Sequence, residues 1–548
     1  MTRRKSRFER PRRDFLKQAA LGGLAFTTGI GGILYSRRAP AVVPADSARP
    51  EASWGIQIGD VTGDRAIVWS RADKPSRLIV EWSRDESFTR RTTIRGPFAL
   101  EWSDYTARVD LAGLPPDQDI FVRASFESLD TTPVQSDVLT GHFRTPPAKR
   151  RDVRFLWSGD TAGQGWGIDL SFGGMKIYEA MRQTQADFFI HSGDTIYADG
   201  PMTERVTDTS GNVIWTNAHL DAVPEKLKVA ETLREFHRNH LYNRFDANVQ
   251  RFSAEIPQIW QWDDHEVTNN WSDAKVLDTR YTEKRIRALT ANATHAFLDY
   301  APMRWSSQVE SERVYRHIPY GRDLDVFVLD MRSYRGPNSF NRQAQMGAET
   351  AFLGAAQIAW LKQKLRDSRA TWKVIAADMP IGLLIPDGTD EQGRPRFEGL
   401  ANGEGPALGR EFEIADLLRF IKREHVVNTV WLTADVHYCA AHYYDPGKAQ
   451  FQDFDPFWEF VAGPLHAGSF GPNTLDNTFG PRVEFQKAPP AANTPPSGGF
   501  QFFGQVDIDH RSKDMLVALK DINGIPVFST RLRARPPYNR SRWEWDDE

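Results

Sequence analysis

Apolar segments that end in an acidic residue recur along this chain, and this pattern limits the fold more than any other feature. One such segment, residues 186–190, is followed by His191-Ser-Gly-Asp194. Short, mostly apolar runs are typical of buried parallel strands. Open α/β sheets bind their ligands at the carboxyl ends of such strands, so we predict that Asp194 points into a cleft.

Tyr197 follows Asp194 by three residues and can reach the same point from a turn. A carboxylate and a phenol supply the oxygen ligands that hard cations prefer. The alternative is that Asp194 only caps the next helix, which is common for an aspartate after a glycine. This stretch alone leaves both interpretations open.

The same pattern occurs earlier and later in the chain. Asp160 follows an apolar run at 153–158, and Asp264 and His265 follow another at 257–262. We predict Asp264 as a metal ligand and His265 as a residue that donates a proton to a leaving oxygen. The alternative for His265 is an ordinary core or surface histidine. The glycine-rich residues after Asp160 lack both the P-loop lysine and the Rossmann spacing, which excludes a nucleotide-binding fold.

Two further apolar runs end in Asp330-Met-Arg332 and in Asp378. A guanidinium group can hold two phosphate oxygens at once, so Arg332 is a candidate for substrate binding. A structural Asp–Arg pair is the alternative. Asn270, in the amide-rich stretch after His265, is a second candidate contact for the substrate.

The last run ends in Asp435-Val-His437-Tyr-Cys439. Side chains alternate in an extended chain, so these three side chains are predicted to share one face. Asp435 and His437 then form a metal-ligand pair. Cys439 either joins them or is a buried, inert thiol.

Length and charge set the class of protein. The chain has 548 residues, 40% of them hydrophobic, a length for which two or three domains are expected. Beyond residue 38 there are 59 basic and 70 acidic residues, a net charge of −11. The protein is therefore globular and has no basic surface of the kind that binds nucleic acid.

Residues 1–45 have the features of an export signal. Arg12-Arg13-Asp-Phe-Leu-Lys17 follows a basic segment and precedes a weakly apolar, glycine-rich run. This resembles a twin-arginine signal, with Pro11 as a departure, and predicts a periplasmic or secreted protein that uses the twin-arginine translocation machinery. The run is too short for a stable membrane span in the mature protein. An uncleaved anchor helix is the alternative, and two small-residue cleavage sites, at 39–41 and 43–45, are equally suitable.

Three further regions follow. Residues 52–146 contain short β-branched and aromatic runs between turn signals, which predict a small antiparallel β-sandwich. We interpret it as a structural module; binding of glycans or of the envelope is the alternative. Residues 152–535 form the predicted catalytic domain, with a polar surface insertion at 200–224 that carries Trp215. A helix is predicted at 225–243, and the turn signal Asn523-Gly524 predicts a hairpin of residues 515–520 and 525–532. Residues 536–548 are an aromatic tail.

Together, these motifs resemble the PhoD-type alkaline phosphatase/phosphodiesterase family of the metallophosphoesterase superfamily. The most specific motifs are Asp263-Asp-His-Glu-x-x-Asn-Asn270 and Leu329-Asp-x-Arg-Ser-Tyr-Arg335. The resemblance implies an α/β (α+β) fold of two packed sheets flanked by helices, preceded by the β-sandwich. It also implies at least two metal ions, iron(III) and calcium in the best-understood members.

The resemblance also assigns the site residues. By matching motifs, the metal ligands are Asp160, Asp194, Tyr197, Asp264, Asp435 and His437, and His265 is the acid beside them. Many members carry a cysteine where this chain has Asp160, which leaves the identity of the metal open.

The expected function is hydrolysis of phosphodiesters, phosphomonoesters or both, by attack of a metal-bound hydroxide on phosphorus. Few cationic side chains lie near the motifs, which favours diesters. The 200–224 insertion with Trp215, together with the tryptophan-bearing tail at 536–548, is predicted to form a wall for their second substituent. The alternative function is a non-catalytic, envelope-binding protein that keeps the metallophosphatase fold.

Overall fold

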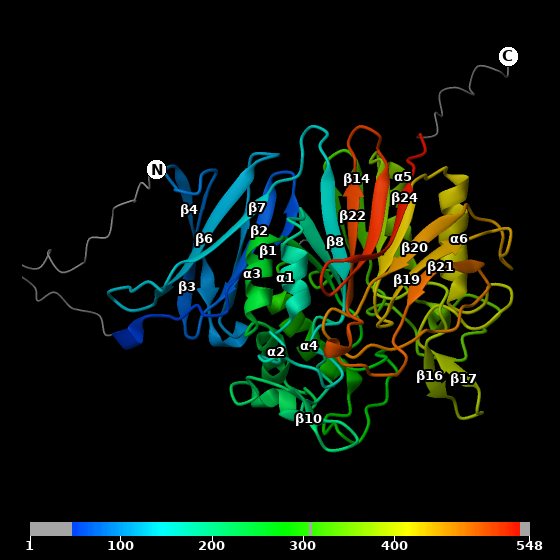
Figure 1. Ribbon diagram of the computed structural model, residues 1–548, viewed down its shortest axis with the longest axis horizontal. Coiled ribbons are helices and arrows are strands. Elements are labelled where there is room, and N and C mark those ends of the chain that lie inside the picture. The colour runs from blue at the N-terminus through cyan, green and yellow to red at the C-terminus, as the bar shows by residue number, and fades with distance from the viewer. Residues whose placement is uncertain (1–45, 306–309, 537–548) are drawn as a thin grey trace, which may run out of the picture. The chain divides into compact units, whose positions relative to one another are not determined.

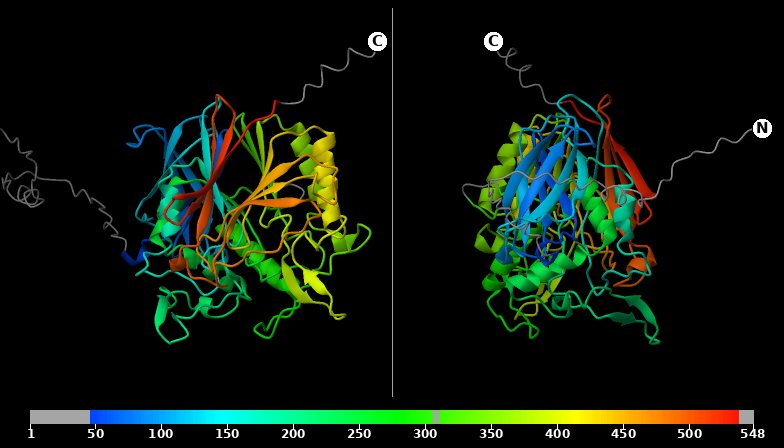
Figure 2. Two further views of the ribbon diagram at one scale, coloured as in Figure 1. Left: turned by 45° about the vertical axis from the view of Figure 1, so that its right-hand side comes forward. Right: turned by 90° about the vertical axis from the view of Figure 1, so that its left-hand side faces the viewer.

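Two large β-sheets that face each other form the centre of the structure (Figures 1 and 2). The computed structural model describes residues 46–305 and 310–536, and all of them belong to one compact unit. The predicted export signal and the tail beyond Pro536 lie outside the described residues.

The first sheet has nine strands. In spatial order they are β24 (Pro526–Leu532), β23 (Met515–Asp521), β22 (Phe502–Ile508), β8 (Val153–Ser158), β9 (Phe188–Ser192), β12 (Gln258–Gln261), β1 (Ile56–Thr62), β2 (Arg65–Arg71) and β5 (Thr106–Leu111). Strands β8, β9 and β12 are parallel to one another, as their apolar runs predicted. The hairpin of β23 and β24 turns at Asn523-Gly524, the expected position.

The second sheet has seven strands. In spatial order they are β13 (Arg316–Tyr320), β14 (Leu324–Val328), β15 (Trp372–Ala376), β18 (Thr429–Thr433), β20 (Phe457–Val461), β19 (Cys439–Tyr444) and β21 (Pro481–Lys487). Strands β14, β15 and β18 run parallel to one another. Both sheets therefore contain a parallel centre, and each apolar run that the sequence pattern singled out is a strand of one of these centres.

A continuous apolar core fills the space between the sheets. Phe155, Trp157 and Ile190 of the first sheet pack with Val374 and Leu432 of the second, all fully buried. Burying an apolar side chain of this size stabilises a fold by about 1.5–3 kcal/mol. The indole N–H of Trp157 also donates to the carbonyl of Thr433 across the interface. This core fixes the two sheets against each other and thereby the loops at their ends.

Helices cover the outer faces of both sheets. Helices α1 (Lys176–Arg182) and α3 (Ala247–Glu255) pack on the nine-stranded sheet, and α5 (Ala355–Asp367) and α6 (Glu411–Arg423) pack on the seven-stranded sheet. Helices α2 (Leu233–Asn243) and α4 (Ile286–Tyr300) pack together around the tryptophans that follow β12. The short 3-10 helices are η1 (Asp46–Ala48), η2 (Glu101–Ser103), η3 (Pro224–Leu227), η4 (Ala348–Thr350) and η5 (Pro496–Gly498).

The predicted helix at 225–243 is wrong in its first half. Residues 224–227 form η3, and α2 begins only at Leu233. Thr232 has an extended backbone and forms a capping box with Glu235, which fixes the start of α2. The buried Val229 and Ala230 between the two helices hold this stretch against the core.

The N-terminal β-sandwich is present and joins the catalytic region. Its second sheet consists of β4 (Arg91–Ala99), β3 (Ser76–Ser83), β6 (Asp119–Ser128) and β7 (Leu139–Arg144), which pack against β1, β2 and β5. Strand β1 also pairs with β12 in parallel, at Gly59 and Gln258. The sandwich thus shares a sheet with the catalytic region. Strand β4 was not predicted, because it is an edge strand whose residues are mostly polar and exposed.

Two small hairpins extend from the body. They are β10 (Arg205–Thr207) with β11 (Val213–Thr216), and β16 (Pro386–Thr389) with β17 (Pro395–Phe397). Figure 1 shows them at the same end of the described structure. The prediction that Trp215 of β11 forms a wall of the site is wrong. Its side chain is buried and packs against Trp166 and His466.

Within residues 46–305 and 310–536, no helix combines the length and the apolar character that a membrane crossing requires.

Candidate metal centre

The carboxyl ends of the parallel strands of both sheets meet at one edge and bring the predicted site residues together. The loops that follow the strands carry Asp160 (after β8), Asp194 (β9), Asp263 to His265 (β12), Arg332 (β14), Asp378 (β15), and Asp435 and His437 (β18). This is the ligand-binding edge expected of parallel sheets.

Three overlapping groups of side chains in the described residues have the spacing of metal ligands. They are Asp160 with Asp194 and His437, Asp194 with Asp264 and His265, and Asp263 with Asp264 and Asp435. Within each group, one ligand atom of every residue lies within 4.8 Å of the others. Asp194 and Asp264 each belong to two groups, so both lie where the groups meet.

Tyr197 lies beside the first group. Its hydroxyl is 2.8 Å from Nε2 of His437, and a Cβ on Gly163 would lie 2.3 Å from its ring, so only glycine leaves room for the phenol. His437 donates its Nδ1–H to the carbonyl of Gly468, which leaves Nε2 as an acceptor or ligand atom. Burial lowers the pKa of His437 to about 4, so the imidazole is neutral, as metal binding requires.

Four of the predicted ligands have left-handed backbones. The φ angles are 69° at Asp160, 51° at Asp194, 66° at Asp435 and 60° at His437. Such conformations are uncommon outside glycine and concentrate at functional sites. The expectation of an extended chain from Asp435 to Cys439 is therefore wrong, yet the turn still brings Asp435 and His437 to the centre.

Cys439 does not reach the centre. It is the first residue of β19, is buried in the core between the sheets, and its Sγ contacts the carbonyl of Lys487. Burial raises the pKa of the thiol. The interpretation of a buried, inert thiol is the one that fits.

Gly193 allows the close approach of the loops after β9 and β12. Its φ is 91°, and a Cβ there would lie 2.4 Å from the Cβ of Asp263. Glu266 fastens the same two loops, because its carboxylate accepts from the backbone N–H of Thr195 and of Asp263. Sequence analysis gave Glu266 no role.

The charge of the centre is not balanced by the protein. Burial and the nearby carboxylates raise the pKa of Asp160, Asp194 and Asp435 well above the usual range of aspartate. Asp160 is fully buried, and neither of its carboxylate oxygens has a hydrogen-bond partner in the described structure. An unpaired buried carboxylate is costly, so these residues fit bound cations. The ligand atoms are all oxygen or imidazole nitrogen, which suits hard or borderline cations.

His265 is held by a buried aspartate. Its Nδ1 lies 2.6 Å from Oδ1 of Asp199, and Oδ2 of Asp199 accepts from the backbone N–H of Asn269. Burial lowers the pKa of His265, but Asp199 and Asp264 outweigh it and raise the pKa to about 10 in the absence of metal. Bound cations would lower this value by repelling the imidazolium. Nε2 is left free, the position needed for proton transfer.

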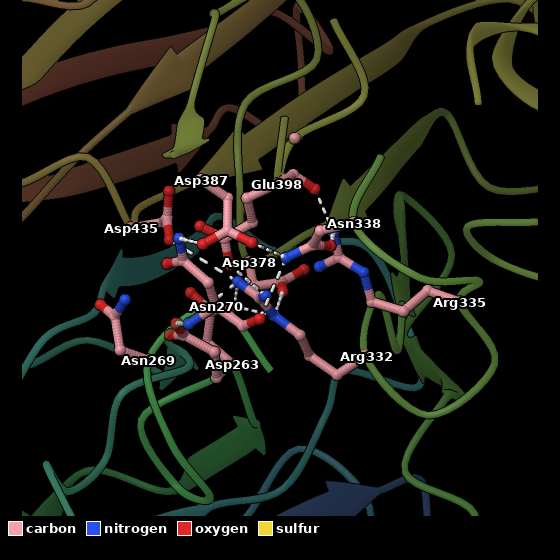
Figure 3. A network of polar contacts seen from close by, with 12 residues as sticks. Asp263, Asn269, Asn270, Arg332, Arg335, Asn338, Asp378, Asp387, Glu398 and Asp435 are labelled. Carbon is pink, nitrogen blue, oxygen red and sulfur yellow. Dashed lines mark hydrogen bonds and ion pairs between the residues drawn. The ribbon is translucent and has the colours of Figure 1, made fainter. Parts of the chain in front are cut away.

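Arg332 lies behind the centre, with other partners than the predicted phosphate oxygens (Figure 3). Its side chain is 0% exposed and pairs with the carboxylates of Asp263 and Glu398, with Asp378 at 3.3 Å. Its Nη2 also lies 3.8 Å from Asp435. Although burial lowers the pKa of Arg332, these carboxylates raise it well above the usual value, so the guanidinium stays charged.

Asn270, the second predicted substrate contact, is attached on both sides. Its backbone N–H donates to Oδ2 of Asp264, and its side-chain amide donates to Oδ1 of Asp387 on β16, at 2.8 Å. Figure 3 shows the contact between Asn270 and Asp387. Asn270 therefore links a candidate ligand to the β16–β17 hairpin.

Sequence analysis missed Asp199, Glu266, Asp387 and Glu398. Asp199 stands five residues after Asp194, in the same polar stretch that follows an apolar run. Its position in this stretch could have indicated that it lies near the site. Asp387 lies in, and Glu398 directly follows, the short polar hairpin of β16 and β17, whose sequence has no periodic pattern, so no local signal marks them.

The fold and the centre define a metallophosphoesterase-like protein, and solved structures agree with the fold. A structure of PhoD superposes with a TM-score of 0.65 at 22% sequence identity, covering 89% of this chain and 90% of that one. The purple acid phosphatase PPD1 from yellow lupin (Lupinus luteus) seeds superposes with a TM-score of 0.52 at 12% identity, covering 88% and 77%.

Comparison with protein families gives the particular family. The PhoD-like phosphatase model matches residues 155–519, and the model of the N-terminal domain of PhoD-like phosphatases matches residues 37–147. "Alkaline phosphatase D" of Bacillus subtilis (strain 168) is 26% identical over 447 residues, covering 77% of this chain and 71% of that protein. The chain belongs to the PhoD-like phosphatase family and is a hydrolase of phosphoric esters.

Proposed function

We propose that this protein is an exported, metal-dependent phosphoesterase that binds at least two cations and hydrolyses phosphodiesters at least as well as phosphomonoesters. The observation that carries the proposal is Asp160, a fully buried carboxylate with no hydrogen-bond partner that belongs to a group with metal-ligand spacing. No group of the described protein balances its charge, whereas a cation would.

The ligands divide into two sets. Asp160, Tyr197 and His437 would hold one cation, and Asp264 and Asp435 a second, with Asp194 shared between them. When bound, such cations lower the pKa of a water nucleophile and stabilise negative charge on the phosphoryl oxygens. We take iron(III) and calcium as the first candidates because the family resemblance suggests them; the oxygen-rich ligand sets are compatible with these and with other divalent metals.

His265 is the proposed proton donor to the leaving oxygen. Asp199 fixes its Nδ1, and Nε2 has no hydrogen-bond partner among the described residues, which leaves this nitrogen available to act as a general acid. The ring of Tyr197 lies 4.3 Å from the ring of His265, between centroids, and restricts its rotation. Protonating an alkoxide leaving group contributes to rate for esters of weakly acidic alcohols.

The charges near the centre favour diesters. A monoester brings a dianionic phosphoryl group, which needs more positive charge than a monoanionic diester. The two arginines of the family motif already have partners within the protein. Arg332 pairs with carboxylates, and Arg335 is buried and donates to the carbonyl of Glu398. Arg332 then acts by balancing charge behind the ligands.

Export is proposed from the twin arginines at positions 12 and 13, outside the described residues. The test fuses residues 1–45 to a reporter protein that is active only after folded export. Changing both arginines to lysine is expected to keep the reporter inside the cell. Unchanged export of the Arg12→Lys, Arg13→Lys fusion would contradict use of the twin-arginine pathway.

Catalysis is tested with the purified protein, matched aryl mono- and diesters, and a metal analysis. We expect at least two metal ions per chain, hydrolysis that a chelator abolishes, and kcat/KM for the diester at least equal to that for the monoester. Activity that resists complete metal removal would contradict metal dependence. A strong preference for the monoester would contradict the diester assignment.

A further inference from the structure

The β16–β17 hairpin is attached to the candidate centre at its base and is exposed at its tip. Asp387 accepts from the side-chain amide of Asn270 at 2.8 Å and from that of Asn338 at 3.0 Å. Asn270 in turn donates its backbone N–H to Asp264. A single residue therefore separates the hairpin from a candidate metal ligand (Figure 3).

Asn338 strengthens this attachment. Its amide group donates to the carbonyl of Asn270 as well as to Asp387, and its carbonyl oxygen accepts from Arg335 and Arg410, each at 3.0 Å. The loop after β12 in the first sheet and the loop after β14 in the second sheet are thus joined at the hairpin base. Because both the amide nitrogen and the carbonyl oxygen of Asn338 are hydrogen-bonded, its side chain holds one orientation and fixes the base of the hairpin.

Two cationic side chains lie at the same base. Arg396 donates its Nε–H to the backbone carbonyl of Asp387, at 3.1 Å, and its guanidinium forms no ion pair with any described residue. Nζ of Lys275 lies 4.0 Å from Oδ1 of Asp387. Arg396 is therefore a positive group at the hairpin base without a carboxylate partner in the described residues, and Lys275 pairs with Asp387 only at 4.0 Å, whereas Arg332 is surrounded by buried carboxylates.

We propose that the β16–β17 hairpin is the specificity-determining wall of the site, and that Asp387 is the positioning residue that fixes it beside Asn270. The wall contacts the second substituent of a phosphodiester, and Arg396 and Lys275 favour substituents that carry polar or anionic groups. This inference rests on the proposed phosphoesterase function. It assigns to this hairpin the role that sequence analysis gave to the buried Trp215.

The test compares 4-nitrophenyl phosphodiesters whose second alcohol is methyl, glyceryl or carboxymethyl, with 4-nitrophenyl phosphate as the substrate that lacks a second substituent. In the hairpin variant, residues 388–395 are replaced by Gly-Ser-Gly, which keeps Asp387 and Arg396. We expect kcat/KM to fall about tenfold or more for the carboxymethyl and glyceryl diesters, mainly through KM, and to stay within about twofold for the monoester.

The matched control shortens the other exposed hairpin, by replacing residues 208–211 with Asn-Gly. This change leaves β10 and β11 in place and is expected to alter no ratio between substrates. Thermal melting of both variants checks their folds. Equal losses of kcat/KM for all esters in the 388–395 variant, or no loss for any of them, would overturn the assignment of the hairpin as the specificity-determining wall.

Point variants keep the proposal testable if the shortened hairpin does not fold. Arg396→Gln is expected to lower kcat/KM about three- to tenfold for the carboxymethyl diester relative to the methyl diester, because it removes one solvent-accessible charge. Asp387→Ala is expected to lower kcat/KM for the glyceryl and carboxymethyl diesters as the hairpin variant does. The metal content, and the chelator concentration that removes half of the metal, are expected to stay unchanged. Loss of metal in Asp387→Ala would show that Asp387 holds the metal ligands in place, and would overturn its role as the residue that positions the hairpin.

A failure of the hairpin assignment can be distinguished from a failure of the proposed function. If the unchanged enzyme hydrolyses none of these esters, the proposed function itself is wrong, and the hairpin assignment falls with it. If the unchanged enzyme hydrolyses them and the variants leave every ratio as it was, only the role of the hairpin is wrong.

Discussion

Two buried acidic groups lie side by side in this protein, and their charges are balanced in different ways. The arginine cluster consists of Asp263, Asp378 and Glu398, which surround the guanidinium of Arg332; Asp263 also belongs to a group with metal-ligand spacing, so it lies where the two clusters meet. The metal cluster consists of Asp160, Asp194, Asp264 and Asp435, with Tyr197 and His437. Both lie at the same edge of the two sheets, and Figure 3 shows Asp435 close to the first cluster.

The difference is the presence of a resident cation. In the arginine cluster the protein supplies a positive charge itself, because Arg332 can pair with several carboxylates through its planar fork. Burial and Asp263 still raise the pKa of Asp378, so the balance is most complete for Asp263 and Glu398. In the metal cluster Arg332 reaches only the periphery, at 3.9 Å from Asp264 and 3.8 Å from Asp435. Asp160 and Asp194 have no arginine or lysine in any described ion pair. The comparison teaches that acidic density alone does not indicate a metal, whereas acidic density without an internal cation does.

The largest expected effect comes from exchanging one carboxylate in each cluster for an amide. Asp194→Asn is expected to lose metal and to reduce activity to the level of the chelated enzyme, because Asp194 belongs to two ligand groups. Asp378→Asn in the arginine cluster is expected to retain the full metal content. Metal analysis and ester hydrolysis check both. Full metal content and full activity in Asp194→Asn would contradict its bridging position.

Variants of His265 test whether this residue, beside the metal cluster, donates the proton to the leaving oxygen. His265→Ala is expected to lower turnover by about 10²–10⁴-fold with metals still bound, which is the usual scale for general acid catalysis. The loss should shrink for esters of acidic phenols, which leave without a proton. Asp199→Asn serves as the milder variant, and it should move the alkaline limit of activity to lower pH, because the carboxylate that raises the pKa of His265 is removed. Equal losses for good and poor leaving groups would remove His265 from this role.

Arg332 tests the other half of the comparison through stability. Arg332→Met is expected to lower the free energy of unfolding by about 3–5 kcal/mol, because it leaves Asp263, Asp378 and Glu398 buried without a cation. Arg154→Met is the matched control. Its ion pair with Asp507 is exposed, and such pairs contribute about 0–1 kcal/mol. Urea denaturation measures both values, and similar losses in the two variants would contradict the charge-balancing role of Arg332.

Much of the metal cluster was predictable, since its residues follow strands that the sequence marks clearly. Uninterrupted apolar runs are read reliably as buried parallel strands, and the residue after each run must lie at the ligand-binding edge. This reasoning placed Asp160, Asp194, Asp264 and Asp435 together. It gave the correct position of Asp435 and His437 for a wrong local reason, because their backbones are left-handed and not extended.

The arginine cluster and the hairpin were not predictable in the same way. Glu398 follows no strand of either large sheet, and Asp387 lies at the base of a short exposed hairpin, so both reach the centre through long loops. The sequence contains no period from which such loop paths can be derived. For the same reason Trp215 was placed on the surface, although tertiary packing against Trp166 buries it. An arginine in a family motif likewise reveals its charge but not whether carboxylates elsewhere in the chain already bind it.

The smallest predicted effect is the pH dependence of stability, which differs with and without metal. In the metal-free protein, burial and neighbouring carboxylates raise the pKa of Asp160 and Asp194 well above the value of about 3.9 in the unfolded chain. The folded state then holds more protons than the unfolded state, so stability falls as pH rises above about 4 toward the raised values. Bound cations favour the ionised carboxylates and remove this dependence.

We therefore expect the free energy of unfolding of the chelated protein to fall by about 1–3 kcal/mol between pH 5 and pH 8, with a smaller change in the metal-loaded protein. Because the carboxylates of the arginine cluster have their cation in both forms, the difference between the two curves reports on the metal cluster. Parallel curves would show that the protein itself balances these charges and would end the distinction between the two clusters.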